Sequence, residues 1–278
     1  MPFRRTSIDS NQRTGFYSPK RSRVVGSRVV TDFDPNAFAY LSAVETADGQ
    51  ALEYDVKVAV NNFVIGCKAD GIWTAIKASC ILAGARTLSG ALVPLIGTAP
   101  TNNNFVSGDY NRETGLVGDG STKYLDSNRN NNVDPQDSRH LSIYVSTASS
   151  IVNFARLIQA GVGNNGSSFI VTSNFSPLIV GLSTNAGSIS SVLNSQTQFI
   201  GISRIDSTNL TCRGANTSAS LSNVSQSPVS GNYFIIGKPA EQHSNSRLAF
   251  YSIGESLDLA LLDTRVTTLI NAIAAAIP

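Results

Sequence analysis

Residues 114–145 of this chain read TGLVGDGSTKYLDSNRNNNVDPQDSRHLSIYV, and this stretch decides the fold. Near its end, one set of side chains (Leu141, Ile143, Val145) alternates with a second set (His140, Ser142, Tyr144). A period of two predicts a half-buried strand of a sheet. The sequence before this stretch has the spacing of helices, whereas the sequence after it consists of short strand patterns. We therefore expect a mainly β domain that follows a short helical region.

The strand patterns continue from residue 114 almost to the end of the chain. Apolar and aromatic runs are separated at short intervals by clusters of Gly, Asn, Ser and Pro, which is typical of an antiparallel sandwich or barrel rather than of βαβ units. The predicted strands are residues 114–117, 122–125, 139–145, 155–159, 168–172, 178–182, 198–205, 209–213, 233–238 and 246–253.

Helical patterns flank the β region on both sides. Asp34 followed by Pro35 is a helix-start signal, an N-cap before a proline at the first helical position. It predicts a helix over residues 36–46, and two more are expected over residues 52–67 and 72–82. Residues 91–96 are expected to form a short strand. A last helix is predicted over residues 257–277, with Ser256 as its N-cap.

Charge is sparse and unevenly distributed. Charged residues make up 14% of the 278 residues, against about 25% in ordinary globular proteins. Residues 1–31 hold seven basic side chains and one acidic side chain, a net charge of +6, which leaves −4 for the rest of a chain whose net charge is +2. The chain is therefore a basic arm followed by a mildly acidic body.

The basic arm, residues 1–33, allows two interpretations. One is a disordered solvated tail. The other is an arm that docks on a neighbouring subunit, because apolar side chains are interspersed with the arginines. The residues expected to dock are Arg4, Arg5, Phe16, Tyr17, Arg21 and Arg23. No motif that reads nucleic acid accompanies these arginines, so specific nucleic-acid binding is not expected.

Cysteine content and hydropathy set further limits. The three cysteines (Cys67, Cys80, Cys212) show no short-range motif, which argues against a disulfide framework. Cys67 and Cys80 fall in an apolar, helix-like region and are expected to be buried. No apolar core follows the early arginines, so no secretory signal peptide is predicted. No apolar run reaches about 18 residues without a charge, so a membrane span is not expected.

One loop has the spacing of metal ligands. Oxygen-bearing side chains stand at the first, third, fifth, ninth and twelfth positions of a calcium-type loop, and they are Asp126, Asn128, Asn130, Asp134 and Asp137. Three features oppose calcium: Asn131 stands where such loops have glycine, the twelfth residue is not glutamate, and Arg129 adds a positive charge. Clusters of Asn and Asp also serve as plain loops that bond their own backbone. The plain loop is the favoured interpretation, with calcium as the alternative cofactor.

Three runs together resemble a known group of proteins. They are ADGIWTAIKASCILAGARTLSGALVPLIG (69–97), TNNNFVSGDYNRETGLVGDGSTKYLDSNRNNN (101–132) and RLAFYSIGESLDLALLDTRVTTLINAIAAAI (247–277). In these runs, the chain resembles a family of tailed-bacteriophage virion proteins that includes tail-fibre and appendage proteins. The resemblance covers the organisation of residues 34–278 and is most specific over residues 101–125 and 247–260. It leaves out the basic arm.

The resemblance implies an architecture. We expect an antiparallel jelly-roll β-sandwich of the concanavalin A-like type, preceded by an extended N-terminal arm and a short helical region and closed by a C-terminal helix. The expected parts are the arm (1–33), a helical docking region (34–97) and the sandwich with its closing helix (98–278). Appendages of this kind are often trimeric, so the resemblance also implies a homo-oligomer.

Enzyme chemistry finds little support in the residues. Hydrolases built on this type of sandwich carry paired carboxylates on one strand in an E-x-D-x-E pattern, and this chain has none. His140 and His243 are both expected at the surface. The glycine-rich GVGNNG (161–166) lacks the Lys-Ser/Thr of a phosphate loop and is expected to be a hairpin turn. We expect no enzyme activity.

Two functions from different classes remain open. The first is a non-enzymatic structural component of a bacteriophage virion, in the tail fibre, baseplate or a head appendage. It would be anchored to capsid, tail or baseplate proteins through the arm and helices. The second is a carbohydrate-binding module that recognises a host-surface glycan. Its expected contacts are the tyrosines Tyr110, Tyr124 and Tyr144, whose rings can stack on sugars.

Overall fold

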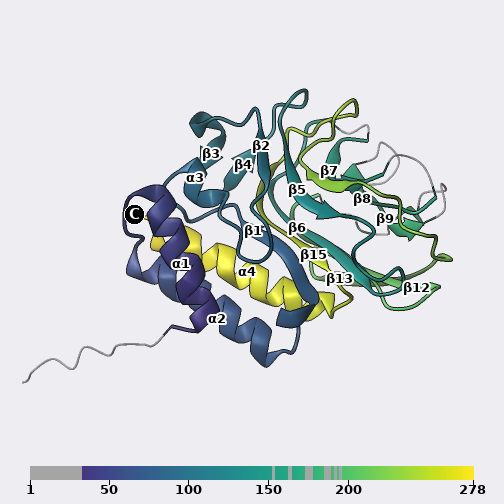
Figure 1. Ribbon diagram of the computed structural model, residues 1–278, viewed down its shortest axis with the longest axis horizontal. Helices are drawn as coiled ribbons and strands as arrows, with labels where there is room; N and C mark the ends of the chain where they lie inside the picture. The colour runs from purple at the N-terminus through teal and green to yellow at the C-terminus, as the bar shows by residue number, and fades with distance from the viewer. Residues whose placement is uncertain are drawn as a thin grey trace, which may run out of the picture. The chain divides into compact units, whose positions relative to one another are not determined.

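Two antiparallel sheets stack face to face in the computed structural model, and helices cover the outer side of one of them (Figure 1). The structure describes residues 33–151, 154–161, 165–172, 178–184, 189–190, 193 and 196–278. The expected docking residues Arg4, Arg5, Phe16, Tyr17, Arg21 and Arg23 lie outside the described residues. The predicted β-sandwich with a closing C-terminal helix is confirmed.

The sheet that carries the helices is named sheet A. Its strand order is β13 (Thr217–Ser222), β12 (Asn209–Gly214), β11 (Gln198–Arg204), β6 (Arg139–Thr147), β15 (Arg247–Gly254), β4 (Gly115–Val117) and β3 (Tyr110–Asn111). A further strand, β1 (Ile76–Ile81), pairs with β15. Sheet A is therefore built from segments that lie far apart in the sequence.

The opposite sheet is named sheet B. Its order is β10 (Ile189–Ser190), β9 (Leu178–Thr184), β8 (Ser167–Thr172), β7 (Arg156–Ala160), β14 (Asn232–Ile235), β5 (Tyr124–Asn130) and β2 (Thr101–Asn103). All its described pairings are antiparallel. β14 lies between β7 and β5 although it comes much later in the chain, so sheet B also joins segments that are far apart in the sequence.

The predicted alternation in β6 is confirmed, but neither of its faces is open. Ile143 pairs with Ile200 of β11 and with Tyr251 of β15, and all three side chains face the core between the sheets. The other face of β6 was expected to be polar and half-exposed. Its Tyr144 is instead buried in a second core, because helices pack on that side of sheet A.

The helices form the outer layer on sheet A. They are α1 (Pro35–Asp48), α2 (Tyr54–Ala69), the short α3 (Leu88–Ala91) and α4 (Leu259–Ala276), with 3-10 turns at Trp73–Ala75 and Ser107–Asp109. The predicted cap is confirmed: the Asp34 carboxylate accepts a hydrogen bond from the Asn36 backbone N–H at 2.9 Å. The cap of the last helix is Asp258 rather than Ser256, because the Asp258 carboxylate accepts from the Ala260 and Leu261 N–H groups.

Two predicted elements between residues 72 and 96 are wrong. Residues 72–82 form a 3-10 turn followed by β1 instead of a helix. Ala78 and Cys80 on this strand face the core between the sheets. The apolar residues of this segment therefore fit a period of two as well as helical spacing. Residues 91–96 are not a strand; α3 ends at Ala91 and Ile96 contributes only an isolated bridge to Ser79.

The helical region and the sandwich share one core. The described chain from Phe33 to Pro278 is a single compact unit. β1 lies within residues 34–97 and is a strand of sheet A, while Val56 and Phe63 of α2 pack in the same cluster as Phe250 of β15. Gly201 of β11 permits the close approach of α4, since a Cβ atom there would stand 2.8 Å from Cδ2 of Leu259.

Among the described helices, α4 is long and apolar enough to cross a membrane, with a mean hydropathy of 1.3. Its buried stripe contains Leu262, Val266 and Ile273, which pack in the core between the helices and sheet A. Two ion pairs hold it in this layer, from Arg213 of β12 to Asp263 and from Arg265 to Asp70, each at 2.7 Å. These contacts are typical of the core helix of a folded domain.

Candidate functional site

The outer face of sheet B, directed away from sheet A, is the candidate site. On β5, the Leu125 and Ser127 side chains are buried beneath the sheet, whereas Asp126 and Asn128 point outward. Residues paired across antiparallel strands share a face, so Phe234 and Thr101, which both pair with Asp126, also point outward. We name five of these side chains the outer-face site: Tyr124, Asp126, Asn128, Asn232 and Phe234.

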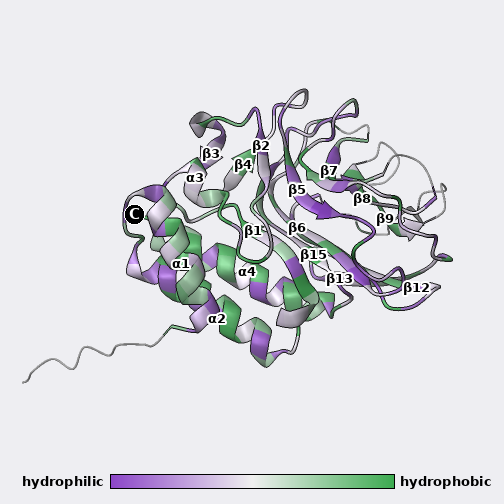
Figure 2. Ribbon diagram, in the orientation of Figure 1, coloured by the Kyte–Doolittle hydropathy of each residue, from purple (hydrophilic) through white to green (hydrophobic). Residues whose placement is uncertain are grey.

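The polar segment DSNRN is strand, not loop, because β5 is paired on both sides. β14 and β2 lie beside it, and the register slips between Asn232 and Phe234. Asn128 has a φ of 55°, a left-handed conformation that asparagine tolerates better than most residues. Figure 2 shows β5 as largely hydrophilic, although it lies in the interior of sheet B. The interior position is possible because only one of its faces is buried.

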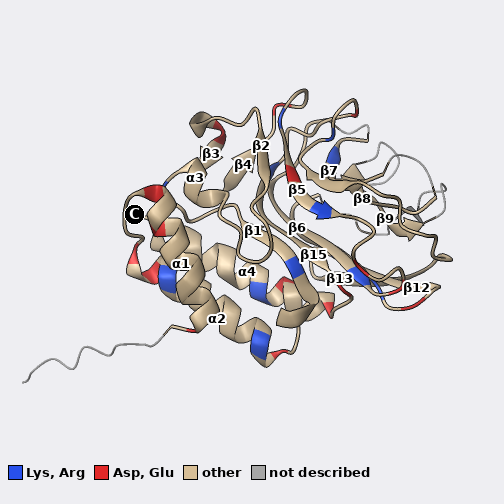
Figure 3. Cartoon of the chain, viewed as in Figure 1, with Lys and Arg blue, Asp and Glu red and all other residues tan. Residues whose placement is uncertain are grey.

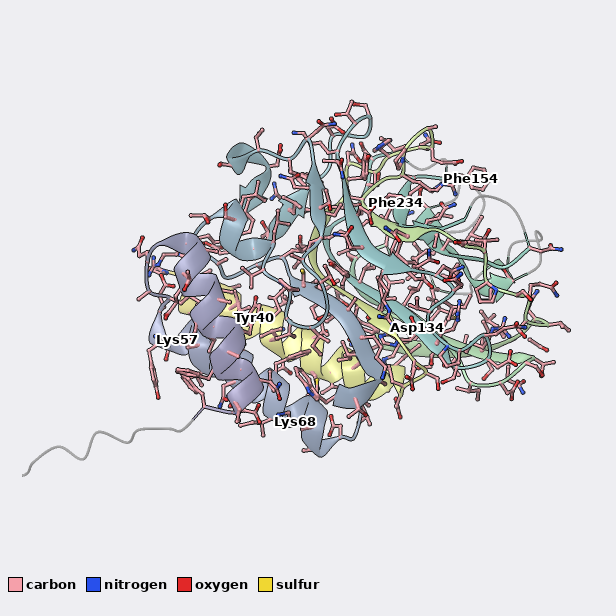
Figure 4. All side chains as sticks on the ribbon, in the orientation of Figure 1. Tyr40, Lys57, Lys68, Asp134, Phe154 and Phe234 are labelled. Carbon is pink, nitrogen blue, oxygen red and sulfur yellow. The ribbon has the colours of Figure 1, made fainter. Side chains whose placement is uncertain are left out.

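An aromatic pair stands in the middle of the site. The Tyr124 and Phe234 rings meet edge to face, with centroids 5.7 Å apart and an interplanar angle of 75°. Both side chains are only half-buried. The His243 ring lies on the other side of Tyr124, with a centroid distance of 5.9 Å. The pair therefore presents aromatic surface to solvent, and the strands beneath it hold it in place. Phe234, which lies on β14, is labelled in Figure 4.

A network of amides and one carboxylate borders the aromatic pair. The Asn232 side-chain amide donates to both oxygens of Asp126, at 3.0 and 3.2 Å. The Asn128 backbone N–H donates to the same carboxylate at 2.8 Å. The Asn128 side-chain amide donates to the Ala99 carbonyl at 2.8 Å and to the Thr101 hydroxyl at 3.0 Å. The amide N–H groups are thus used within the protein, which leaves oxygen acceptors for a ligand.

A groove of about 210 Å³ adjoins the site just before β2 begins. It is lined by Lys77, Ala78, Gly97, Thr98, Ser127, Asn128, Arg129, Asn130 and Val133. Asn128 belongs both to the outer-face site and to this groove. A ligand that lies on the aromatic pair can therefore extend toward a concave surface.

The basic side chains on the strands around the site are in ion pairs. Arg129 of β5 binds the buried Asp134 carboxylate, and Arg156 of β7 donates to Glu241 at 2.8 Å. Lys123, immediately before β5, contacts Asp109 at 2.6 Å. Figure 3 shows only a few charged positions, of both signs, along β5 and β7. The Asp126 carboxylate is the one charged group within the outer-face site.

The structure separates the five residues of the alternative calcium interpretation. Asp126, Asn128 and Asn130 lie on β5, so the loop interpretation is wrong for the first half of the segment. Asp134 is bound by Arg129, and the buried Asp137 Oδ1 receives no hydrogen bond. Among the described residues, no group of three or more His, Cys, Asp or Glu side chains could hold a metal ion. Two of the predicted residues, Asp126 and Asn128, instead belong to the outer-face site.

The predicted tyrosines have different environments. Tyr124 is part of the outer-face site. Tyr144 is wrong as a sugar contact, because it is 8% exposed and lies beneath the helices. Tyr110 is half-buried, and its hydroxyl donates to the Ala85 carbonyl at 2.7 Å. The sequence did not single out Asn232 or Phe234; the signal for Phe234 was its alternation with the apolar Tyr233 and Ile235.

Both histidines are buried, so the expectation of surface histidines is wrong. His140 lies within hydrogen-bond distance of the Glu255 carbonyl at 2.6 Å and the Ser252 hydroxyl at 2.8 Å. Burial lowers the pKa of His140 to about 4. His243 Nδ1 lies 3.0 Å from the Glu241 carbonyl. Neither ring pairs with a carboxylate among the described residues, and the buried His140–Ser252 pair cannot reach a substrate.

The three cysteines are free and buried, as predicted for Cys67 and Cys80. Burial raises the pKa of the Cys67 and Cys80 thiols to about 12, so neither is a reactive thiolate. Cys80 lies on β1 rather than on a helix. None of these thiols belongs to the outer-face site.

No protein-family model and no curated protein matches this chain. Solved structures with similar folds include the binding domain of botulinum neurotoxin serotype D, at 13% identity and a TM-score of 0.47, over 70% of this chain and 51% of that one. A Trypanosoma rangeli sialidase in complex with 2,3-difluorosialic acid has 10% identity and a TM-score of 0.44, over 84% and 38%. The enzymatically active domain of tailspike protein 2 of bacteriophage CBA120 has 11% identity and a TM-score of 0.40, over 61% and 29%. The chain spans about half of the first of these proteins and less of the other two, and similarities of this extent do not say what it binds.

Proposed function

We propose that this chain is a non-catalytic glycan-recognition module and that the outer-face site is its binding surface. The observation that carries the proposal is the half-exposed Tyr124–Phe234 pair beside the Asp126–Asn232 hydrogen-bond network. A pyranose ring has apolar C–H faces and a rim of hydroxyl groups. Aromatic rings pack on the C–H faces, and carboxylate and amide oxygens accept hydrogen bonds from the hydroxyl groups. Flat sheet strands hold both kinds of group in fixed positions.

The same geometry favours recognition over hydrolysis. Glycoside hydrolysis uses two carboxyl groups on opposite sides of the scissile bond, about 5–9.5 Å apart. Within the outer-face site, Asp126 is a single carboxylate, and nearby Glu241 is bound by Arg156. The Asp126 oxygens already accept three hydrogen bonds, from Asn128 and Asn232. A carboxylate that accepts these hydrogen bonds is better suited to contact a ligand than to donate a proton as a general acid.

A glycan-binding assay with paired variants tests this function. A panel of immobilised bacterial and mammalian oligosaccharides is probed with the labelled full chain, and then with Phe234→Ala and Phe38→Ala. Phe38 is the matched control, because it is an exposed phenylalanine on α1, remote from sheet B. We expect Phe234→Ala to reduce binding at least about tenfold, which corresponds to roughly 1.4 kcal/mol. Phe38→Ala should bind like the natural chain. Equal binding by all three proteins, or no binding to any glycan, contradicts the proposal.

A second proposal concerns where this module works: we infer that it is a structural part of a bacteriophage virion. The observation that favours an interface is the exposure of apolar side chains on the helices expected to dock. Phe38 of α1 is 63% exposed, and Tyr54 and Ile65 of α2 are 56% and 46% exposed. Ion pairs from Lys57 to Glu45 and from Lys68 to Asp34 join the two helices (Figure 4). These ion pairs hold the two helices together, so that α1 and α2 offer a rigid surface for a contact with another virion protein.

Particle assembly tests the structural role independently of glycan binding. Removal of residues 1–31 should leave a folded protein that no longer joins particles. Phe38→Ala combined with Ile65→Ala should reduce incorporation without changing the glycan panel. Normal occupancy in particles for both variants contradicts the docking role. The homo-oligomer implied by the resemblance stays a prediction, and light scattering on the purified chain measures it.

A further inference from the structure

We infer that the outer-face site takes a neutral, hydroxyl-rich glycan and discriminates against sugars that carry a carboxylate, an inference that rests on the proposed glycan-recognition function. Three features of the site favour a neutral ligand: the sign of its charge, the hydrogen-bonding groups left free there, and the environment of the nearest basic side chains.

The central charge of the site is negative. The Asp126 carboxylate lies on the outer face beside Phe234, its partner in the strand register. A sialic or uronic acid placed on the aromatic pair would bring a second carboxylate close to it, and like charges repel strongly near a protein surface. A neutral sugar has no such penalty. The hydroxyl groups of a neutral sugar can donate to Asp126, whereas an ionised carboxylate only accepts.

The free hydrogen-bonding groups are acceptors. The Asn232 and Asn128 side-chain amides donate to Asp126, Ala99 and Thr101, so their N–H groups are largely used within the protein. Gln159 of β7 pairs with Phe234 and so belongs to the same face. Its buried Oε1 receives no hydrogen bond, while its amide nitrogen donates to the Gly161 carbonyl. Gln159 is 1% exposed, so its acceptor lies beneath the surface of this face rather than on it.

The basic side chains near the site do not offset its negative charge or its excess of hydrogen-bond acceptors. Arg129 and Arg156 are held by Asp134 and Glu241. Lys238, which follows β14, is the basic side chain near the face for which the structure shows no ion pair, and its charge is attracted by Glu241 and repelled by Arg156. Of the described basic side chains near this face, Lys238 is therefore the candidate anchor for an acidic sugar, and its substitution separates the two ligand classes.

The test compares a neutral sugar with the same sugar extended by an acidic sialic acid residue. Lactose and sialyllactose are titrated into the full chain, and the wider neutral panel is tested in parallel. We expect the neutral members to bind at least about tenfold more tightly than their sialylated counterparts. Asp126→Asn, which keeps the shape of the side chain, should weaken neutral binding and reduce this ratio. Lys238→Ala should leave neutral binding and the ratio of the two affinities unchanged. A melting curve of each variant verifies that it is folded.

The possible failures can be told apart. If sialylated sugars bind more tightly, and Lys238→Ala removes that binding, the neutral class is wrong while glycan recognition stands. If Asp126→Asn improves neutral binding, the role assigned to the carboxylate is wrong. If neither neutral nor acidic sugars bind, the proposed function itself fails. Neutral preference that depends on Asp126 and not on Lys238 supports the inference.

Discussion

Sheet A and sheet B are built from strands with the same period of two, yet they have different surroundings. The central strand β6 of sheet A is buried on both faces: Ile143 faces sheet B and Tyr144 faces the helices. In sheet B, β5 and β14 are buried on one face only, and their other face carries Tyr124, Asp126 and Phe234. Sheet A therefore contributes mainly to stability, whereas the exposed part of the outer face of sheet B is open for a binding function.

The largest expected effect is a core substitution in sheet A. Phe250 of β15 is fully buried, and its ring packs against Phe63 of α2 with centroids 5.9 Å apart. Phe250→Ala should reduce the free energy of unfolding by about 3–5 kcal/mol, because it removes buried area and leaves a cavity. Urea denaturation measures the loss. A loss below about 1 kcal/mol would show that the layer between helices and sheet A is not a stability core.

The next effect is the pH dependence that His140 gives to sheet A. Burial lowers the pKa of His140 to about 4, so the folded protein holds the ring neutral. The unfolded chain binds a proton near pH 6.5, so the stabilisation is complete above that pH and is lost as the pH falls toward about 4. The loss attributable to His140 should be roughly 3 kcal/mol. Denaturation midpoints at several pH values, compared with His140→Gln, isolate it. An identical slope for both proteins contradicts the prediction.

A smaller stability effect is expected from the corresponding substitution in sheet B. Phe234 is half-buried on the outer face, and its described aromatic contact is the edge of Tyr124. Phe234→Ala should cost no more than about 1.5 kcal/mol of unfolding free energy, although it should abolish most glycan binding. The ratio between the Phe250→Ala and Phe234→Ala losses measures the difference between the sheets directly. Equal losses would mean that the outer face of sheet B also belongs to the core.

The smallest effect is expected from calcium. Asp134 is occupied by Arg129, and Asp126 accepts from Asn232, so neither carboxylate is free for a cation without rearrangement. Calcium added to the chelator-treated protein should produce no heat in calorimetry and no change in melting temperature. Saturable heat together with a raised melting temperature would restore the calcium interpretation of residues 126–137. It would also require the end of β5 to adopt another conformation.

Local signals predicted much of the fold. The cap at Asp34, the buried stripe of α4 and most strands of both sheets were recognisable because each depends on neighbours a few residues away. β1 was not, because IKASCI also fits helical spacing and its strand conformation depends on pairing with β15, far along the chain. β13 was missed because TSASLS has almost no apolar alternation, and the strand forms against β12.

The candidate site was predicted only in fragments. Tyr124 was expected as a sugar contact and Asp126 as a metal ligand, and the structure places both on the outer face of sheet B. Their partners Asn232 and Phe234 come from a strand more than a hundred residues later. No local pattern links two strands at that separation, so the site could not be assembled from spacing alone.

The amino-acid sequence by itself determined the class of the protein: an antiparallel sandwich that follows a capped helix and carries few charges. Only the tertiary structure decided which strand faces are buried. The period of two shows that a strand has two faces, but not what covers each of them. In sheet A, helices from both ends of the described chain cover the second face and bury Tyr144. In sheet B, the second face holds Tyr124, Asp126 and Phe234, because the described helices pack on the other sheet.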